Sequence, residues 1–587
     1  MSVASPASIL SPFATALRQS WRKPLRTPQF LANAVMESWS EQIKECRPGA
    51  WRPRTVRRLY NRHGKLTPLA QSIATATKNY SLQAEPLVVH DDAGVALVFM
   101  LRSFGYAHAF HNYMVAHALK DLGYHVQLIQ CDGLLESCGS GSSAKPTTTP
   151  PYLCKECRTL AHSFYTEPFQ TMSLDEFASK REDLLIELIE EQKDYSLARL
   201  TVDGLPIGRW MQPYLLRYVR GHREKISLDN PEVLQHVRGV VRLVCRYQRV
   251  LARFTPSCAV FFNGLFAPEA IFYHMSTSLG VATICTERGP KKNTLFLSRE
   301  AACHYRAEAL WASHQGSIGE AEIAEARASV ESRTRLNLDP SGRPRPIEVS
   351  DSKPYDELAK EPYVVFFPPV FHDTASMEKP SPFADVFGAI DALCKEAIRR
   401  KVKLVIRSHP DEAADTSAGA YRVHDFLAER GHLAYSTIHC LKPEETWNAY
   451  LLAEKASATV VYNGTLGMEL PALGYRIFNI AQSHYAGKGF TEDVLTPEDL
   501  AKIFDSTTTR LDDAARTTAL RYWYFYYNLA SLPVGSVLDE KEPSQFELNT
   551  HATTEEIRSV RHAIRERVEL LLKQDLALSP LSSIPKP

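Results

Sequence analysis

The 587-residue sequence has no apolar run long enough for a transmembrane helix and few cysteines for its length. A spanning helix needs roughly 18–20 apolar residues, and residues 1–20 have too short an apolar core for a secretory signal. The 11 cysteines are an odd number at low density, which argues against a secreted disulfide scaffold. We therefore expect a cytoplasmic protein.

Several catalytic signatures are also missing from the sequence. It contains no Walker motif, no GxSxG elbow, no HExxH helix and no GxGxxG after a predicted strand. Nothing therefore argues for a nicotinamide cofactor, and we expect the reaction itself to need none. Hydrophobic residues make up 44% and charged residues 23%, as in ordinary globular proteins.

The charge is unevenly distributed, although the net charge is only +1. Between Arg18 and Lys65, twelve Lys and Arg accompany three Asp and Glu, a balance of +9. Trp21, Phe30 and Trp39 lie in the same segment. It is either a solvated helical extension packed on the core or a contact for an anionic membrane or an acidic polymer. We expect no nucleic-acid partner.

Predicted strands and helices alternate along most of the chain. Apolar runs at 95–101 and 125–130 flank a helical pattern that ends at Gly123, which makes a βαβ unit. A second such unit covers 258–289, and the alternation resumes over 363–480. These patterns predict an α/β fold with two Rossmann-like, doubly wound domains that face a cleft, with helical extensions.

A proline-rich stretch at 339–354 is predicted to join the two domains. Near the C-terminus, a capping box of Thr553 and Glu556 precedes an apolar stripe and predicts one long helix. The predicted parts are a basic helical extension at 1–90, an N-terminal Rossmann-like domain at 91–338, a linker at 339–360, a C-terminal Rossmann-like domain at 361–508 and C-terminal helices at 509–587.

Ligands of an open parallel sheet bind beyond the carboxyl ends of its strands. Arg407, Ser408 and His409 follow one predicted strand of the C-terminal domain. Imidazole and guanidinium groups suit a phosphate because both donate charge-assisted hydrogen bonds. The alternative is that His409 is an ordinary surface or core histidine.

The stretch VVYNGTLGMELPALG, at 460–474, reads as a strand, a turn at Asn463 and Gly464, and a helix that opens at Thr465. A helix start offers N–H groups and a positive dipole end to an anion. Glu469 lies one turn further on the same face and could accept hydrogen bonds from a ribose diol. Alternatively, Thr465 is only a helix cap and Glu469 a solvated charge.

Three further groups follow predicted strands or open a helix. Glu287 and Arg288 end a strand of the N-terminal domain, where a carboxylate could act as base or nucleophile in group transfer. An arginine-paired structural glutamate is the alternative. His108 and His111 open the first helix of that domain, and Lys488 lies in a glycine-rich loop that could close over a ligand.

Four cysteines cluster within 27 residues, and the last two form a C-x-x-C pair. Four thiols can hold a structural zinc ion in tetrahedral geometry. The long intervening loop keeps free thiols or a disulfide open as alternatives. The cysteines are Cys131, Cys138, Cys154 and Cys157.

Three segments together resemble the capsule-polysaccharide biosynthesis family. They are FFPPVFHDTAS at 366–376, IRSHP at 406–410 and the stretch from 460 to 493. The family comprises bacterial cytoplasmic glycosyltransferases of GT-B architecture and includes the Kdo transferases. Similar motifs occur in bacterial sialyltransferases, which use CMP-activated sugars. The likeness is densest over 363–495.

The resemblance implies transfer of a sugar from a CMP- or UDP-activated donor to a surface or capsular glycan, free or lipid-linked. It assigns His409 and Thr465 to the donor phosphate and Glu287 to the general base. It places the acceptor in the N-terminal domain and the donor in the C-terminal one. The chain departs from the family where Gly464 replaces a hydroxyl residue and where Arg288 replaces a second acid.

Two rival functions stay open. One is a nucleotide-sugar 2-epimerase on the same double fold, and the other is a non-catalytic glycan- or nucleotide-binding protein. We expect a cytoplasmic location, in part on the membrane surface. The predicted catalytic residues are Glu287 and His409, and the predicted binding residues are Arg407, Ser408, Asn463, Gly464, Thr465, Glu469, Lys488, His108 and Arg288.

Overall fold

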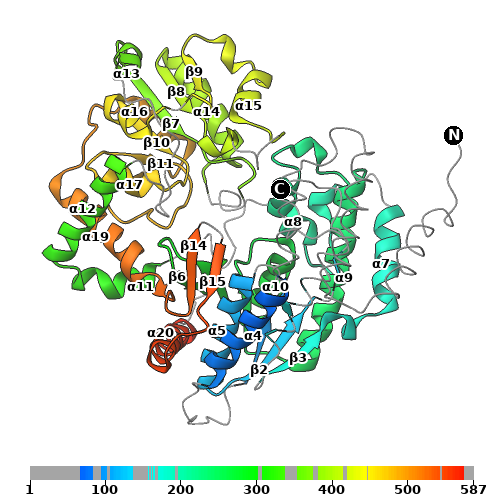
Figure 1. The fold of residues 1–587 in the computed structure, drawn as a ribbon. Helices are drawn as coiled ribbons and strands as arrows, with labels where there is room; N and C mark the ends of the chain where they lie inside the picture. The colour runs from blue at the N-terminus through cyan, green and yellow to red at the C-terminus, as the bar shows by residue number, and fades with distance from the viewer. Residues whose placement is uncertain are drawn as a thin grey trace, which may run out of the picture. The chain divides into compact units, whose positions relative to one another are not determined.

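The protein contains two large β-sheets flanked by helices, one mixed and one fully parallel (Figure 1). Both sheets belong to residues 70–587, which form one compact unit. The computed structural model describes residues 66–82, 94–101, 106–131, 133–135, 157, 160–161, 163–164, 169–191, 196–301, 307–336, 353–373, 381–413, 419–445, 447–542 and 545–573.

The N-terminal sheet has seven strands in the order β13-β6-β5-β4-β1-β2-β3. The five strands β3-β2-β1-β4-β5 are parallel and follow the Rossmann order, whereas β6 and β13 are antiparallel additions. Their bounds are β1 Val95–Phe99, β2 His125–Gln130, β3 Gln170–Ser173, β4 Cys258–Phe262, β5 Ala282–Arg288, β6 Thr294–Ser298 and β13 Leu532–Pro533.

The C-terminal sheet has six strands in the order β12-β11-β10-β7-β8-β9, and every pairing is parallel. Read from β9, this is the complete Rossmann order. All five residues of β7 are buried, as expected for a strand covered on both faces. The bounds are β7 Tyr363–Phe367, β8 Lys403–Arg407, β9 Ile438–Leu441, β10 Ala458–Val461, β11 Phe478–Asn479 and β12 Glu492–Asp493.

Among the helices up to residue 336, α5 and α10 cover the N-terminal sheet, with α5 packed on β1, β2, β4 and β5 and α10 packed on β4, β5, α8 and α9. The alternation of short apolar runs with helical periods places one helix after each central strand. The bounds are α4 Leu66–Leu82, α5 Tyr106–Asp121, α7 Lys180–Glu191, α8 Ile207–Tyr218, α9 Pro231–Phe254, α10 Ala267–Ser278, α11 Glu308–His314 and α12 Glu320–Leu336.

The second group of helices accompanies the C-terminal sheet, and α19 packs on both α12 and α17. The helix α14 begins at an Asp385 side-chain cap and ends at Lys401 in the left-handed conformation, with φ 58°. The bounds are α13 Lys353–Leu358, α14 Val386–Arg400, α15 Val423–Glu429, α16 Ala449–Lys455, α17 Leu466–Ala472, α18 Leu500–Phe504 and α19 Asp513–Tyr524.

The end of the described chain returns to the N-terminal sheet. After β13 it forms a hairpin of β14 (Leu538–Glu542) and β15 (Gln545–Leu548), and then the helix α20 (Thr554–Lys573). The helix α20 packs on α5, where Arg561 forms an ion pair with Asp121 at 2.7 Å. The predicted capping box and buried apolar stripe of this helix are confirmed.

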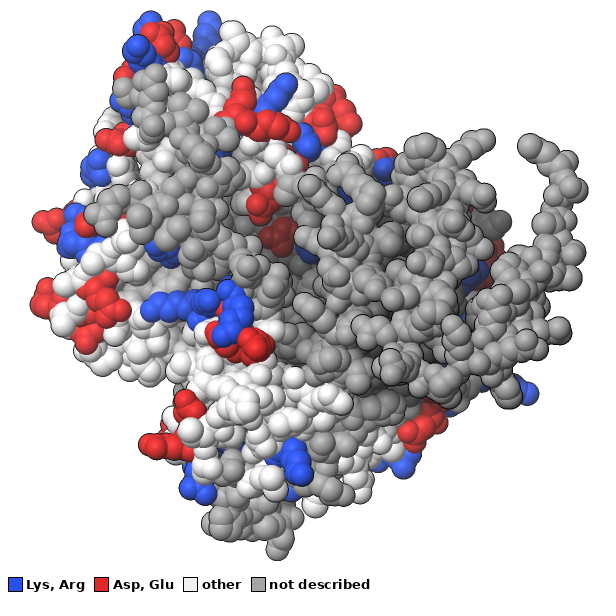
Figure 2. All heavy atoms as spheres, in the orientation of Figure 1, with Lys and Arg blue, Asp and Glu red and all other residues white. Residues whose placement is uncertain are grey.

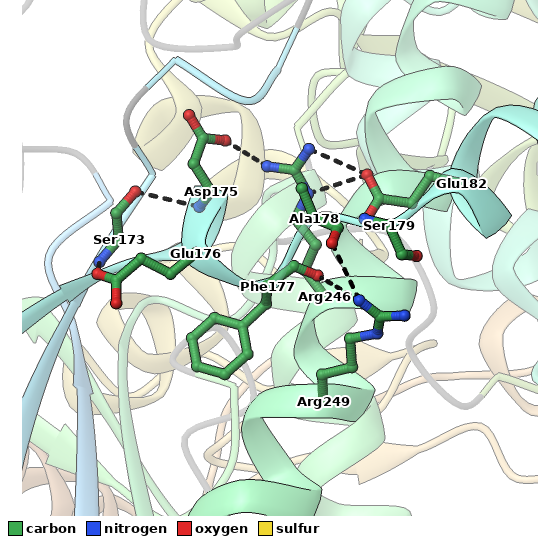
Figure 3. A network of polar contacts seen from close by, with 9 residues as sticks. All are labelled: Ser173, Asp175, Glu176, Phe177, Ala178, Ser179, Glu182, Arg246 and Arg249. Carbon is green, nitrogen blue, oxygen red and sulfur yellow. Dashed lines mark hydrogen bonds and ion pairs between the residues drawn. The ribbon is translucent and has the colours of Figure 1, made fainter.

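A buried charge network attaches the edge of the N-terminal sheet to α9 (Figure 3). Arg246 of α9 is 8% exposed and bonds Glu182 of α7, which is 3% exposed. Its other partner, Asp175, is mostly exposed. Arg249 donates to the backbone oxygens of Phe177 and Ala178 at 3.2 and 3.0 Å. Two arginines on one helix thus hold the turn that follows β3.

The predicted α/β class with two Rossmann-like parts is confirmed. The region 168–254 is mostly helical but also supplies β3, and the region of the predicted C-terminal helices contains three short strands. The basic segment 18–65 and most of the predicted linker lie outside the described residues. The predicted domain boundaries therefore stay predictions.

On the described part of the face drawn in Figure 2, Lys and Arg are interspersed with Asp and Glu. No helix in the described part of the chain is both long enough and apolar enough to cross a bilayer.

Candidate functional site

Both sheets reverse their strand order at one point, and ligands of such sheets bind at the carboxyl ends of the strands beside it. The reversal lies between β1 and β4 in the N-terminal sheet and between β7 and β10 in the C-terminal sheet. Asn263 follows β4, His372 follows β7 and Thr465 follows β10. The candidate site is therefore built from two strand edges, one on each sheet.

The turn after β10 presents Gly464 and Thr465 to solvent. Thr465 occupies the N-cap position of α17, as the alternative interpretation predicts, but its side chain makes no capping hydrogen bond. The Tyr485 hydroxyl donates to the Gly464 carbonyl at 2.8 Å. A Cβ on Gly467 would overlap the Tyr485 ring, so the glycine permits this contact. The Tyr485 contact thus holds the turn in place, and Thr465 remains an exposed residue.

Glu469 does not share that open surface. Its side chain is 1% exposed, and the Tyr450 hydroxyl of α16 donates to Oε2 at 2.7 Å. Both interpretations of Glu469 from the sequence, as a ribose contact beside Thr465 or as a solvated charge, are therefore corrected. The reason is that α16 covers the face of α17 that carries this carboxyl group.

The three consecutive residues at the end of β8, Arg407, Ser408 and His409, have different environments. Arg407 Nη2 donates to the Trp447 carbonyl at 3.0 Å, and Ser408 is 1% exposed with Oγ 3.8 Å from Cys440 Sγ. The His409 side chain is 43% exposed. Its ring is thus the accessible group of the three.

The tautomer of His409 follows from one backbone contact. The Asp411 N–H donates to Nδ1 at 3.2 Å, so a neutral ring carries its proton on Nε2. The imidazole can therefore donate a hydrogen bond outward from Nε2, even when it is uncharged.

Glu412 lies directly behind this loop and was not predicted from the sequence. Its N–H donates to the His409 carbonyl at 3.0 Å, and its carboxyl group, 1% exposed, accepts weakly from the Val423 N–H at 3.4 Å. Burial raises its pKa to about 8, although Val423 and Arg422 oppose the shift. Burial therefore favours the protonated, neutral form of this carboxyl group.

The N-terminal edge holds Glu287 through Asn263. The Asn263 side-chain amide donates to Glu287 Oε2, and the Asn263 N–H donates to the Thr286 carbonyl at 2.9 Å. Asn263 has φ 60°, a left-handed conformation that asparagine tolerates. Sequence reasoning missed this residue, although an Asn-Gly pair directly after a strand is a usable signal.

Arg288 has a different environment from Glu287. Its Nε lies 2.9 Å from Glu540 Oε2 of β14, and the Glu540 side chain is 2% exposed. Asn293 holds the same hairpin, because its Nδ2 donates to Asp539 Oδ1 at 2.7 Å and its Oδ1 accepts from the Glu540 N–H at 2.6 Å. The structure thus ties Arg288 to a β-hairpin.

The two histidines at the start of α5 occupy different positions. The His108 ring lies 3.9 Å from the Phe262 ring at the end of β4, centroid to centroid, so it borders the N-terminal edge. His111 is 1% exposed, and burial, with a smaller effect of His108, lowers its pKa to about 3. His111 is therefore a neutral core histidine.

Lys488 lies between Gly487 and Gly489, whose φ values are 68° and 86°. The loop around it is anchored, because the Gly487 N–H donates to Asp493 Oδ2 at 2.7 Å and Phe490 is 1% exposed. The pattern of glycines predicts a loop that closes over a ligand, and that motion stays a prediction.

The cysteine prediction is only partly covered by the structure. Cys131 follows β2, and Cys157 Sγ lies 4.0 Å from the Leu101 carbonyl oxygen. Cys138 and Cys154 lie outside the described residues. Within the described ranges, no three His, Cys, Asp or Glu side chains form a metal-binding group. The structural zinc stays a prediction.

Comparison with known proteins finds no matching family model and no matching curated protein. Solved structures with partial similarity include a β-Kdo 2,4-transferase, KpsC from Thermosulfurimonas dismutans, with 12% identity, 53% of this chain and 87% of that chain covered and a TM-score of 0.33.

Another is a sucrose-phosphate synthase from Thermosynechococcus elongatus, with 11% identity, 81% of this chain and 98% of that chain covered and a TM-score of 0.24. A third is a UDP-GlcNAc 2-epimerase from Neisseria meningitidis, with 10% identity, 74% of this chain and 97% of that chain covered and a TM-score of 0.21. Similarities of this size establish neither a family nor an activity for the chain.

Proposed function

We propose that the protein is a GT-B glycosyltransferase that moves a sugar from a nucleotide-sugar donor, CMP- or UDP-activated, to a glycan. The observation that carries the proposal is the His409 loop, where an accessible imidazole, whose Nδ1 accepts from the Asp411 N–H, lies at the carboxyl edge of a Rossmann-order sheet. Thr465, an exposed residue that follows β10, adds a hydroxyl group at the same edge of the sheet.

The donor side would act on the leaving phosphate. As the bond between the anomeric carbon and the phosphate oxygen breaks, its electron pair passes to that oxygen. His409 Nε2–H and the Thr465 hydroxyl donate hydrogen bonds to the growing charge, and such donors contribute most when they are fixed beforehand. The Asp411 N–H and the Tyr485 contact at Gly464 supply that fixation.

The acceptor side would use Glu287. Its carboxylate takes the proton of the acceptor hydroxyl while that oxygen bonds to the anomeric carbon. The Asn263 amide orients this carboxylate through Oε2. The motifs that resemble the capsule-polysaccharide family support a surface or capsular glycan as acceptor, free or lipid-linked, on the cytoplasmic face of the membrane.

The test is a thermal-shift screen of the purified protein with CMP, UDP, GDP and their sugars, followed by His409→Ala. We expect one nucleotide class to stabilise the protein and the variant to lose roughly 1.5–3 kcal/mol of nucleotide binding. His551→Ala, in an exposed turn before α20, is the control.

Turnover of the donor without any acceptor would instead identify a 2-epimerase. Binding without turnover, with or without a glycan, would identify a non-catalytic protein. Unchanged nucleotide affinity in His409→Ala would remove His409 from the site.

A further inference from the structure

Arg217, at the end of α8, stands beside the N-terminal edge and is exposed. Its guanidinium carbon lies 5.5 Å from the centroid of the Phe266 ring. Phe266 precedes α10, three positions after Asn263, the residue that holds Glu287. The aromatic ring supports the cation and leaves its N–H groups available.

The residues directly after Arg217 are attached to the C-terminal part of the chain. The Tyr421 N–H donates to the Arg220 carbonyl at 2.9 Å, and His222 Nε2 lies 3.1 Å from the Gly419 carbonyl. Arg223 forms an ion pair with Asp385, the cap of α14. The end of α8 is therefore held against the part of the chain that carries the C-terminal sheet.

His372, which follows β7 at the reversal of strand order, is the C-terminal group whose pKa is lowered in part by the charge of Arg217. Burial lowers its pKa to about 4, and Arg217 and Arg220 contribute to the lowering, whereas Asp373 and Asp411 oppose them. A neutral imidazole cannot neutralise a guanidinium. Among the described residues, Arg217 also makes no ion pair with a carboxylate.

We propose that Arg217 binds the phosphate of the donor from the N-terminal side, opposite to the contacts of His409 and Thr465. The proposal rests on the proposed function and deepens it. A phosphate contact explains why Arg217, at the fixed end of α8, packs on the Phe266 ring and has no acidic partner within the described part of the chain. A guanidinium matches phosphate geometry with two parallel hydrogen bonds, which a lysine cannot reproduce.

A carboxylate on the sugar would suit the same cation, so the test must separate the two sources of negative charge. Arg217→Gln is compared with a control variant, Arg209→Gln. Arg209 is also exposed and lies eight positions earlier on the same helix. The probes are CMP and UDP, which carry phosphate, and cytidine and uridine, which carry none. Equal melting temperatures of the free variants show that the fold is intact.

We expect Arg217→Gln to weaken binding of the preferred nucleotide about tenfold or more, equivalent to roughly 1.4 kcal/mol. Arg209→Gln should stay within about twofold, and the nucleosides should bind both variants alike. Arg217→Lys should recover part of the affinity, because a point charge remains.

Failure of this inference differs from failure of the proposed function. If His409→Ala weakens nucleotide binding and Arg217→Gln does not, Arg217 has no phosphate role, while the proposed function stands. An effect of Arg217→Gln on an acidic sugar donor but not on its nucleotide would also overturn it in favour of a carboxylate contact. If the wild-type protein binds no nucleotide and no pyrophosphate, both proposals fail.

Discussion

Arg288 and Glu540 form an ion pair between β5 and the C-terminal hairpin, with Nε and Oε2 2.9 Å apart. Successive side chains of a strand point to opposite faces. Thr286 and Arg288 therefore share one face, where Thr286 bonds Asn112 of α5, and Glu287 points to the other. A single stretch of strand thus supplies one anchoring residue and one candidate catalytic residue.

Glu540→Gln should destabilise the protein by roughly 3 kcal/mol, because Arg288 loses its buried counter-charge. Chemical denaturation measures the change in the free energy of unfolding. Glu547→Gln, on β15 with a side chain 67% exposed, should change it by less than about 1 kcal/mol. Similar losses in the two variants would contradict a special role for the pair.

Glu182→Ala should cost roughly 3–5 kcal/mol of stability, since it leaves Arg246 buried without its inner partner. Asp175→Ala removes the outer partner, which is 57% exposed, and should cost much less. Urea unfolding of both variants ranks them. The reverse ranking would show that the exposed contact carries the network.

Glu412 should make the protein less stable as the pH rises. Its pKa of about 8 in the folded state lies above the ordinary glutamate value of 4.5, so between these values the folded state keeps a proton that the unfolded state has released. The stability that this proton supports is fully present below pH 4.5 and is lost as the pH rises through 8. Within this window, the free energy of unfolding falls by up to about 1.4 kcal/mol per pH unit.

Melting temperatures measured from pH 5 to pH 9 check this dependence. Glu412→Gln should flatten it and raise stability at the alkaline end, because the amide needs no proton. Glu454→Gln, at an exposed position on α16, is the control and should leave the slope unchanged. An identical slope in Glu412→Gln would mean that another group is responsible.

Glu287→Gln should reduce the transfer rate roughly 10²–10⁴-fold and leave donor affinity within about twofold, because a general base acts on the acceptor proton. Thr465→Val should instead weaken donor binding modestly. Initial rates and nucleotide titrations separate the two effects. A normal transfer rate in Glu287→Gln would show that another residue acts as the general base.

The cysteine cluster predicts about one zinc ion per chain in the purified protein, with loss of metal and stability in Cys154→Ser. Elemental analysis and melting temperature measure both. Metal-free protein with the same melting temperature before and after chelator treatment would leave the cysteines as thiols or a disulfide.

Local periodicity was sufficient for the long elements. The strands β1, β4 and β7 are buried apolar runs, and α20 combines a capping box with an apolar stripe, so each pattern is complete within its own segment. The short strand β3, with the sequence QTMS, has no such pattern. It is a strand because β2 offers it backbone partners.

The sequence by itself determined which residues end or follow the parallel strands, and therefore that His409, Thr465 and Glu287 lie at the carboxyl edges of the two sheets. Only the tertiary structure decided which side chains face outward. Tyr450 covers Glu469, and Glu540 binds Arg288, although both partners lie on other elements. Burial and pairing depend on contacts between distant segments, which no local spacing encodes.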